Sequence, residues 1–104
     1  MTTLTYAVAG GNASVTINTI NKTANKVSFQ VSGDGAVNGA VAIKLQESNT
    51  AAGTFKDVSG ATATVNTSTD EYVDGGDFNS GFLQFDVAVG SATLGTITFV
   101  VNYK

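Results

Sequence analysis

The chain has 104 residues, enough for one domain with a buried core; 42% are hydrophobic and only 12% are charged. Its net charge is −3, its five lysines are scattered and it contains no arginine, which argues against a nucleic-acid partner because phosphates require clustered basic residues. The absence of cysteine and histidine excludes disulfides, thiolate or histidine metal sites, and the Ser-His-Asp and Cys-His catalytic arrangements.

The N-terminal segment, MTTLTYAVAGG, has neither the basic region nor the long apolar region of a signal peptide. No apolar run approaches the roughly 18 residues of a membrane helix. We therefore expect synthesis in a cytoplasm and no membrane partner.

Along the chain, apolar and polar residues alternate with a period of two, the pattern of half-buried β-strands. The clear runs cover residues 4–8, 15–18, 27–32, 41–46, 83–89 and 97–103, with shorter pieces at 55–58 and 62–65. Glycine and asparagine between the runs, including Asn38-Gly39, Gly60 and Gly75-Gly76, predict tight turns. The pattern predicts an all-β fold, an antiparallel sandwich of seven to eight strands, with residues 1–104 as a single domain. Phe85 and Phe99 are expected on inward faces.

The segment TDEYVDGGDFNSG, residues 69–81, carries four of the eight acidic residues and is predicted to be an inter-strand loop. Asp77-x-Asn79-x-Gly81 is similar to the start of a calcium-binding loop, but the position of the closing glutamate is taken by Ala88. We expect a solvated loop without a metal ion, with calcium binding as the alternative.

The same segment contains aromatic and apolar residues, which in a loop form a partner-binding patch or fold inward to cap the sandwich. We predict partner contacts at Tyr72, Val73 and Phe78, together with Val100 on a nominally outward face. For catalysis only a pair of carboxylates remains, and a small sandwich rarely supplies the cleft that such a pair needs. We therefore predict no catalytic residue, no cofactor and no enzymatic activity.

The stretch Ile43-x-Leu45-Gln46-x-Ser48, a polar turn with Gly53, and Phe55-x-Asp57-Val58-x-Gly60 resembles a hairpin of small Ig-like virion proteins of tailed bacteriophages. The resemblance covers Val41 to Tyr103 and implies an Ig-like sandwich. Leu83 and Phe85 stand where antibody domains have the tyrosine of the tyrosine corner and a bridging cysteine, so any such domain is held by apolar packing alone.

The resemblance implies a structural protein of the virion, an auxiliary or decoration protein or a head fibre. Its partner would be the major capsid protein or another virion protein, on whose repeating lattice weak contacts add together. Self-association into a homo-oligomer is a further expectation. The alternative function is a carbohydrate-binding or adhesion module that uses Tyr72, Phe78 and the nearby acids.

Overall fold

The structure, a computed structural model, describes residues 2–17, 25–78 and 80–103. Its elements are β1 (Thr2–Ala7), the 3₁₀ turn η1 (Val8–Gly10), β2 (Ala13–Ile17), β3 (Lys26–Gly33), β4 (Val37–Ser48), β5 (Lys56–Thr67), β6 (Asp70–Asp77), β7 (Phe82–Ala88) and β8 (Thr96–Tyr103). No helix within these ranges has the length and apolar character needed to cross a membrane.

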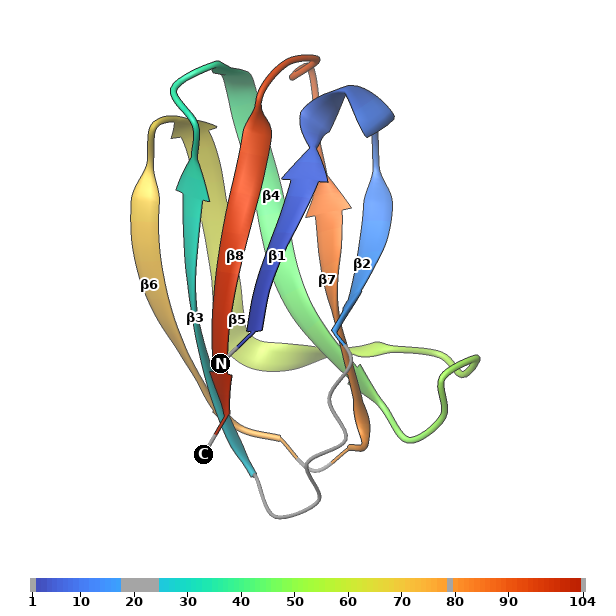
Figure 1. Cartoon of the computed structure of the whole chain (residues 1–104). Helices are drawn as coiled ribbons and strands as arrows, with labels where there is room; N and C mark the ends of the chain where they lie inside the picture. Colours follow the sequence, from blue (N-terminus) through green and yellow to red (C-terminus); the bar gives the residue numbers. More distant parts are fainter. Residues whose placement is uncertain (1, 18–24, 79, 104) are drawn as a thin grey trace.

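The strands form two four-stranded antiparallel sheets packed face to face (Figure 1). Sheet A has the order β1-β8-β3-β6, and sheet B has the order β2-β7-β4-β5. The prediction of an all-β sandwich with up to eight strands is confirmed.

The strand order nevertheless differs from that of an immunoglobulin domain, in which consecutive strands such as A and B pair within one sheet. Among the strands of the described residues, β4 and β5 are the one consecutive pair that lies side by side in the same sheet, and the other strands alternate between the two sheets. Such alternation is the arrangement of an eight-stranded jelly roll, another double-sheet fold. The Ig-like part of the expectation is therefore corrected, whereas the hairpin that suggested it is present as β4–β5.

Three phenylalanines form the centre of the interior between the sheets. The Phe85 ring stacks on Phe99 with centroids 4.4 Å apart and meets Phe29 edge to face at 4.9 Å. All three side chains are at most 1% exposed. The predicted inward positions of Phe85 and Phe99 are confirmed, and the contacts join both sheets because Phe85 lies on β7 and the other two lie on β8 and β3.

Some glycine-containing positions that were expected in turns lie inside strands instead. Asn38-Gly39 belongs to β4 and Gly60 to β5, and the pairing of these two strands shifts register twice. Gly60 has φ +76°, a conformation that glycine adopts without steric cost. These glycines therefore build bulges in long strands, which is the other role of glycine in a sheet.

Residues 70–77 were expected in a loop but form the strand β6, at one edge of sheet A. The strand pairs with β3 from Lys26–Asp77 to Ser32–Asp70, with one bulge between Val27 and Ser28. Val73, opposite Phe29, is buried in the core. The apolar contact made by this inward side chain, together with the backbone pairing, explains why an acidic, glycine-containing segment is a strand.

Candidate functional site

The outer face of sheet A brings two of the predicted contact residues together. Gln30 on β3 lies opposite Tyr72 on β6 and opposite Val100 on β8, and Val100 in turn lies opposite Thr3 on β1. Tyr72 is 65% exposed, whereas Val100 is half-buried. Tyr72 and Val100 therefore belong to one cross-strand row, which runs across the sheet and is called the central row below.

The other two predicted contact residues are not on the surface. Val73 is 8% exposed and Phe78 is 6% exposed, and both belong to the hydrophobic core. The Phe78 ring packs edge to face on Tyr103, with ring centroids 6.5 Å apart. A partner cannot reach either side chain in this structure, so the assignment of Val73 and Phe78 to a contact surface is corrected. Phe78 instead fulfils the alternative of an aromatic that folds inward.

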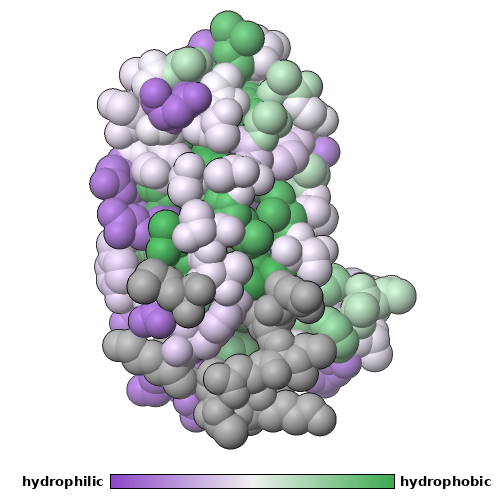
Figure 2. Space-filling model, in the orientation of Figure 1, coloured by the Kyte–Doolittle hydropathy of each residue, from purple (hydrophilic) through white to green (hydrophobic). Residues whose placement is uncertain are grey.

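A groove lies beside Tyr72 on the same face. Its lining consists of Lys26, Val27 and Ser28 from β3 with Tyr72 and Asp74 from β6, and its volume is about 330 Å³. We call it the Tyr72 groove. One wall is an aromatic ring, and the other side chains supply an ammonium, a hydroxyl and a carboxylate. Figure 2 shows the strongly hydrophilic atoms of this face gathered mainly on the β6 side, with hydrophobic atoms scattered over its middle.

The bulge in β6 sets the position of Asp74. Ser28 pairs with Asp74 and Val27 pairs with Gly76, so Gly75 is the extra residue. Gly76 has φ +66°, and its N–H donates to Asp74 Oδ1 at 3.0 Å. A Cβ on Gly75 would lie 3.0 Å from the Val27 carbonyl oxygen, closer than ordinary contact. The two glycines thus permit a bulge whose backbone holds the Asp74 carboxylate.

A second hydrogen bond orders the central row. The Gln30 amide Nε2 donates to Asp70 Oδ1 at 2.7 Å, across from β3 to β6. This bond directs the Gln30 amide toward Asp70, two residues before Tyr72 on β6. The polar groups around Tyr72 are therefore held by strands and hydrogen bonds rather than by loops, which favours binding because less conformational freedom is lost.

The acidic residues of β6 are spread along the strand. Asp70 and Asp74 project from the same face four positions apart, about 13 Å in an extended strand. Within the described ranges no group of three or more acidic residues is placed to hold a metal ion. Asn79 of the calcium-like motif lies outside the described residues.

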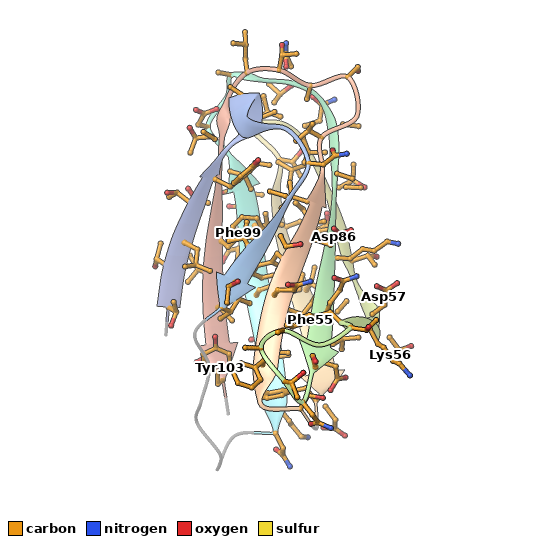
Figure 3. All side chains as sticks on the ribbon, turned by 90° about the vertical axis from the view of Figure 1, so that its right-hand side faces the viewer. Phe55, Lys56, Asp57, Asp86, Phe99 and Tyr103 are labelled. Carbon is orange, nitrogen blue, oxygen red and sulfur yellow. The ribbon has the colours of Figure 1, made fainter. Side chains whose placement is uncertain are left out.

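The outer face of sheet B has a different organisation. Gln84 Nε2 donates to Gln46 Oε1 at 2.8 Å, and Gln46 Nε2 donates to Asp57 Oδ1 at 2.9 Å. Lys44 Nζ lies 3.7 Å from Asp57 Oδ2. Figure 3 shows Asp57 and Asp86 on the outer side of sheet B and Phe99 in the interior. The side chains of Gln84, Gln46, Asp57 and Lys44 form one network across β7, β4 and β5.

The sequence pattern singled out Tyr72 but not Lys26, Ser28 or Gln30. These three residues are about 45 positions before Tyr72 in the chain, and only the β3–β6 register brings them beside it. Their alternation with Val27 and Phe29 was the available signal, since it places them on the outer face of their strand.

No protein-family model matches the chain, and no match was found among the curated proteins. A solved structure described as "CBM4 structure and function" is similar, with 15% sequence identity and a TM-score of 0.41. The match covers 89% of this chain and 59% of that one, so the chain spans less than two thirds of the solved structure's length. Similarity at this level carries no information on ligand or activity.

Proposed function

We propose that this protein is a non-catalytic binding module whose Tyr72 groove, on the outer face of sheet A, holds a neutral glycan. The observation that carries the proposal is the combination, in one groove, of an exposed aromatic ring with a carboxylate, an ammonium and a hydroxyl. The proposal develops the carbohydrate-binding alternative and replaces Phe78 with residues from β3.

Tyr72 differs from the other aromatic residues of the chain, which are all buried or half-buried. Most of their rings belong to the core or pack against it, whereas the Tyr72 ring is 65% exposed on a strand surface. An aromatic ring offers a flat apolar surface together with a polar edge. The C–H face of a pyranose can stack on that surface while the tyrosine hydroxyl remains in contact with water or with a sugar hydroxyl.

The remaining groove residues match the hydrogen-bonding needs of sugar hydroxyls. The Asp74 carboxylate accepts, the Lys26 ammonium donates, and the Ser28 hydroxyl does both. The groove volume is at the lower end of the range for ligand sites, about 300–1,000 Å³. This size suits a short stretch of a glycan that continues along the sheet surface.

The charge on β6 favours neutral over acidic glycans. Asp70, Asp74 and Asp77 are all exposed on this strand, and the net charge of the chain is −3. A sialylated or uronic-acid glycan would meet a negative potential at the groove. Discrimination between neutral and acidic sugars is therefore part of the proposal.

The spacing of Asp70 and Asp74 disfavours hydrolysis by that pair of acids. Inverting glycosidases separate their two carboxyl groups by about 6.5–9.5 Å and retaining ones by about 5–5.5 Å. Asp70 and Asp74, on one face of β6, are about 13 Å apart along the strand. Each also accepts a hydrogen bond, from Gln30 and from Gly76, which orients it as part of the sheet surface.

The proposal is tested on an array of neutral and sialylated glycans, followed by calorimetric titration of the glycans that bind. Tyr72→Ala should weaken binding at least about tenfold, equivalent to about 1.4 kcal/mol. The matched control is Leu94→Ala, because Leu94 is 59% exposed but lies in the β7–β8 connection, outside the groove. Absence of binding to any neutral glycan, or equal binding by Tyr72→Ala and the wild type, would overturn it.

The hairpin supports a second candidate function. The β4–β5 turn extends away from the sandwich (Figure 1), and its residues 49–54 are exposed. In the phage proteins that the sequence resembles, this hairpin belongs to a module of the virion, so docking on a capsid lattice is proposed as the alternative. Co-sedimentation with capsids and cryo-electron microscopy of intact particles test it. Absence of the protein from particles counts against this candidate and leaves glycan binding unaffected.

A further inference from the structure

The two open sides of the sandwich have different chemistry. On one side lie the edge strands β1 and β2, with sequences TTLTYA and ASVTI, which contain no charged residue and no proline. On the other side lie β6, with four acids and a bulge, and β5, with Lys56, Asp57 and irregular pairing. Charges and bulges on edge strands prevent pairing with further strands. The β1 edge has neither protection.

We propose that β1 pairs antiparallel with β1 of a second copy of this chain, in the register that places Thr5 opposite Thr5. The result is a dimer with one continuous eight-stranded sheet A. This pairing does not depend on the proposed function.

Backbone groups on β1 are available for this pairing. The Val8 N–H donates to the Gly95 carbonyl, which continues the β1–β8 register. In an antiparallel ladder, hydrogen-bonded and non-hydrogen-bonded positions alternate. Tyr6 and Leu4 are therefore bonded to β8, whereas the N–H and C=O groups of Thr3, Thr5 and Ala7 point away from it, toward the open edge. The side chains of these three residues are exposed.

The proposed register also matches the side chains. With Thr5 at the two-fold axis, Thr3 lies opposite Ala7 of the second copy on the outer face, and no charge meets a charge. On the inner face Leu4 lies opposite Tyr6 of the second copy. Both side chains are half-buried against the core, and the Tyr6 hydroxyl donates to the Gly11 carbonyl oxygen. Aromatic and aliphatic cross-strand pairs of this kind stabilise sheets, and the pairing would remove both from water.

The distribution of charge explains why the partner is a second copy at this edge. The acids of β6 lie at the opposite edge of sheet A, with two strands between β6 and β1. Two copies can thus approach through β1 without placing acidic strands together, whereas β6 against β6 would oppose like charges. Pairing of β1 with β1 about a two-fold axis uses this edge of both copies and therefore produces a closed dimer rather than a fibre.

The dimer would place two Tyr72 grooves on one surface. A two-fold axis perpendicular to the sheet keeps both outer faces on the same side, and the strand order becomes β6-β3-β8-β1-β1-β8-β3-β6. Seven strand spacings separate the two β6 strands, about 34 Å. Two sites at that separation would engage a repeating glycan with higher avidity than one. This consequence, unlike the pairing, rests on the proposed function.

Disulfide trapping tests the register. The chain has no native cysteine, so Thr5→Cys introduces a single thiol. In the proposed dimer the two substituted positions have Cα atoms about 5.5 Å apart, within the range for a disulfide. The control is Thr98→Cys, which lies opposite Thr5 on the neighbouring strand β8 and would be about 14 Å from its equivalent in the second copy. Mild oxidation should cross-link the first variant and not the second. Equal cross-linking of the two variants would overturn the register.

Sedimentation equilibrium without glycan tests the dimer itself. The wild type should dimerise, and Thr5→Lys and Thr5→Glu should each raise the dimer dissociation constant about tenfold or more, because like charges meet at the axis. An equimolar mixture of these two variants should restore dimerisation, and Thr98→Lys should behave as the wild type. A monomeric wild type at about millimolar concentration would overturn the proposal. A dimer that binds no glycan would support the pairing and contradict only the proposed function.

Discussion

The two outer faces of the sandwich come from the same alternating pattern and yet use their polar side chains differently. On sheet B, Gln84, Gln46 and Asp57 bond one another across three strands. On sheet A, hydrogen bonds fix Gln30 and Asp74 around a tyrosine ring that is 65% exposed and borders a groove. Polar composition alone therefore does not locate a binding face. The exposed ring, and polar groups directed around it, distinguish sheet A.

The largest effect should come from the interior that both faces share. Phe85→Ala removes a ring that contacts Phe29 and Phe99, and it should lower the free energy of unfolding by about 3–5 kcal/mol. Urea denaturation measures this loss. A loss below about 1 kcal/mol would contradict the packing described for the core.

The bulge that shapes only the sheet A face should give the next largest effect. Gly76→Ala forces an alanine into φ +66° and should cost about 1–2 kcal/mol of stability. It should also weaken glycan binding, because the bulge holds Asp74. Gly81→Ala is the control, since Gly81 lacks positive φ and a Cβ there meets nothing within 4 Å. Equal stability of the two variants in thermal unfolding would contradict this role of the bulge.

A substitution on sheet B separates stability from binding. Gln46→Ala removes two hydrogen bonds and leaves the half-buried Gln84 amide without that acceptor, so it should cost about 1 kcal/mol of stability. Glycan affinity should stay at the wild-type value in calorimetry. A clear fall in affinity would place the ligand on sheet B instead.

The last effect concerns alkaline pH and a residue away from both faces. Burial raises the pKa of Tyr103 from 10.0 to about 12. The folded state therefore holds the Tyr103 proton more tightly than the unfolded state. The stability that this difference contributes is complete below pH 10 and is lost as pH rises toward 12. Urea denaturation at pH 9 and 11.5 should show a smaller alkaline loss of stability for Tyr103→Phe than for the wild type. Identical losses would mean that Tyr103 does not contribute.

Much of the fold was predictable because alternation reports the inward face of each strand. It identified most strands and placed Phe85 and Phe99 inside. It does not report which strand lies beside which, because both immunoglobulin and jelly-roll orders satisfy the same inward pattern. The strand order therefore comes from the structure, and the Ig-like expectation rested on the resemblance alone. The strand β6 was missed because its glycines and acids are rare in strands.

The candidate site was predictable only in part, for a related reason. Tyr72 and Val73 are neighbours in the sequence, but in a strand neighbouring side chains point to opposite faces, so one is exposed and the other buried. A loop over residues 69–81, as predicted from the sequence, has no such alternation of outward and inward side chains. The proximity of Val100, Gln30 and Ser28 to Tyr72 depends on register, which is a property of the folded sheet.

The most direct test of the glycan-binding face is a nuclear magnetic resonance titration of the ¹⁵N-labelled protein with a neutral glycan selected from the array. We predict that amide shifts will change at Tyr72, Ser28 and Asp74 on the outer face of sheet A, while Gln46 and Gln84 on sheet B remain unchanged. Shifts centred on Gln46 and Gln84, or no shift with any neutral glycan at millimolar concentration, would contradict the account.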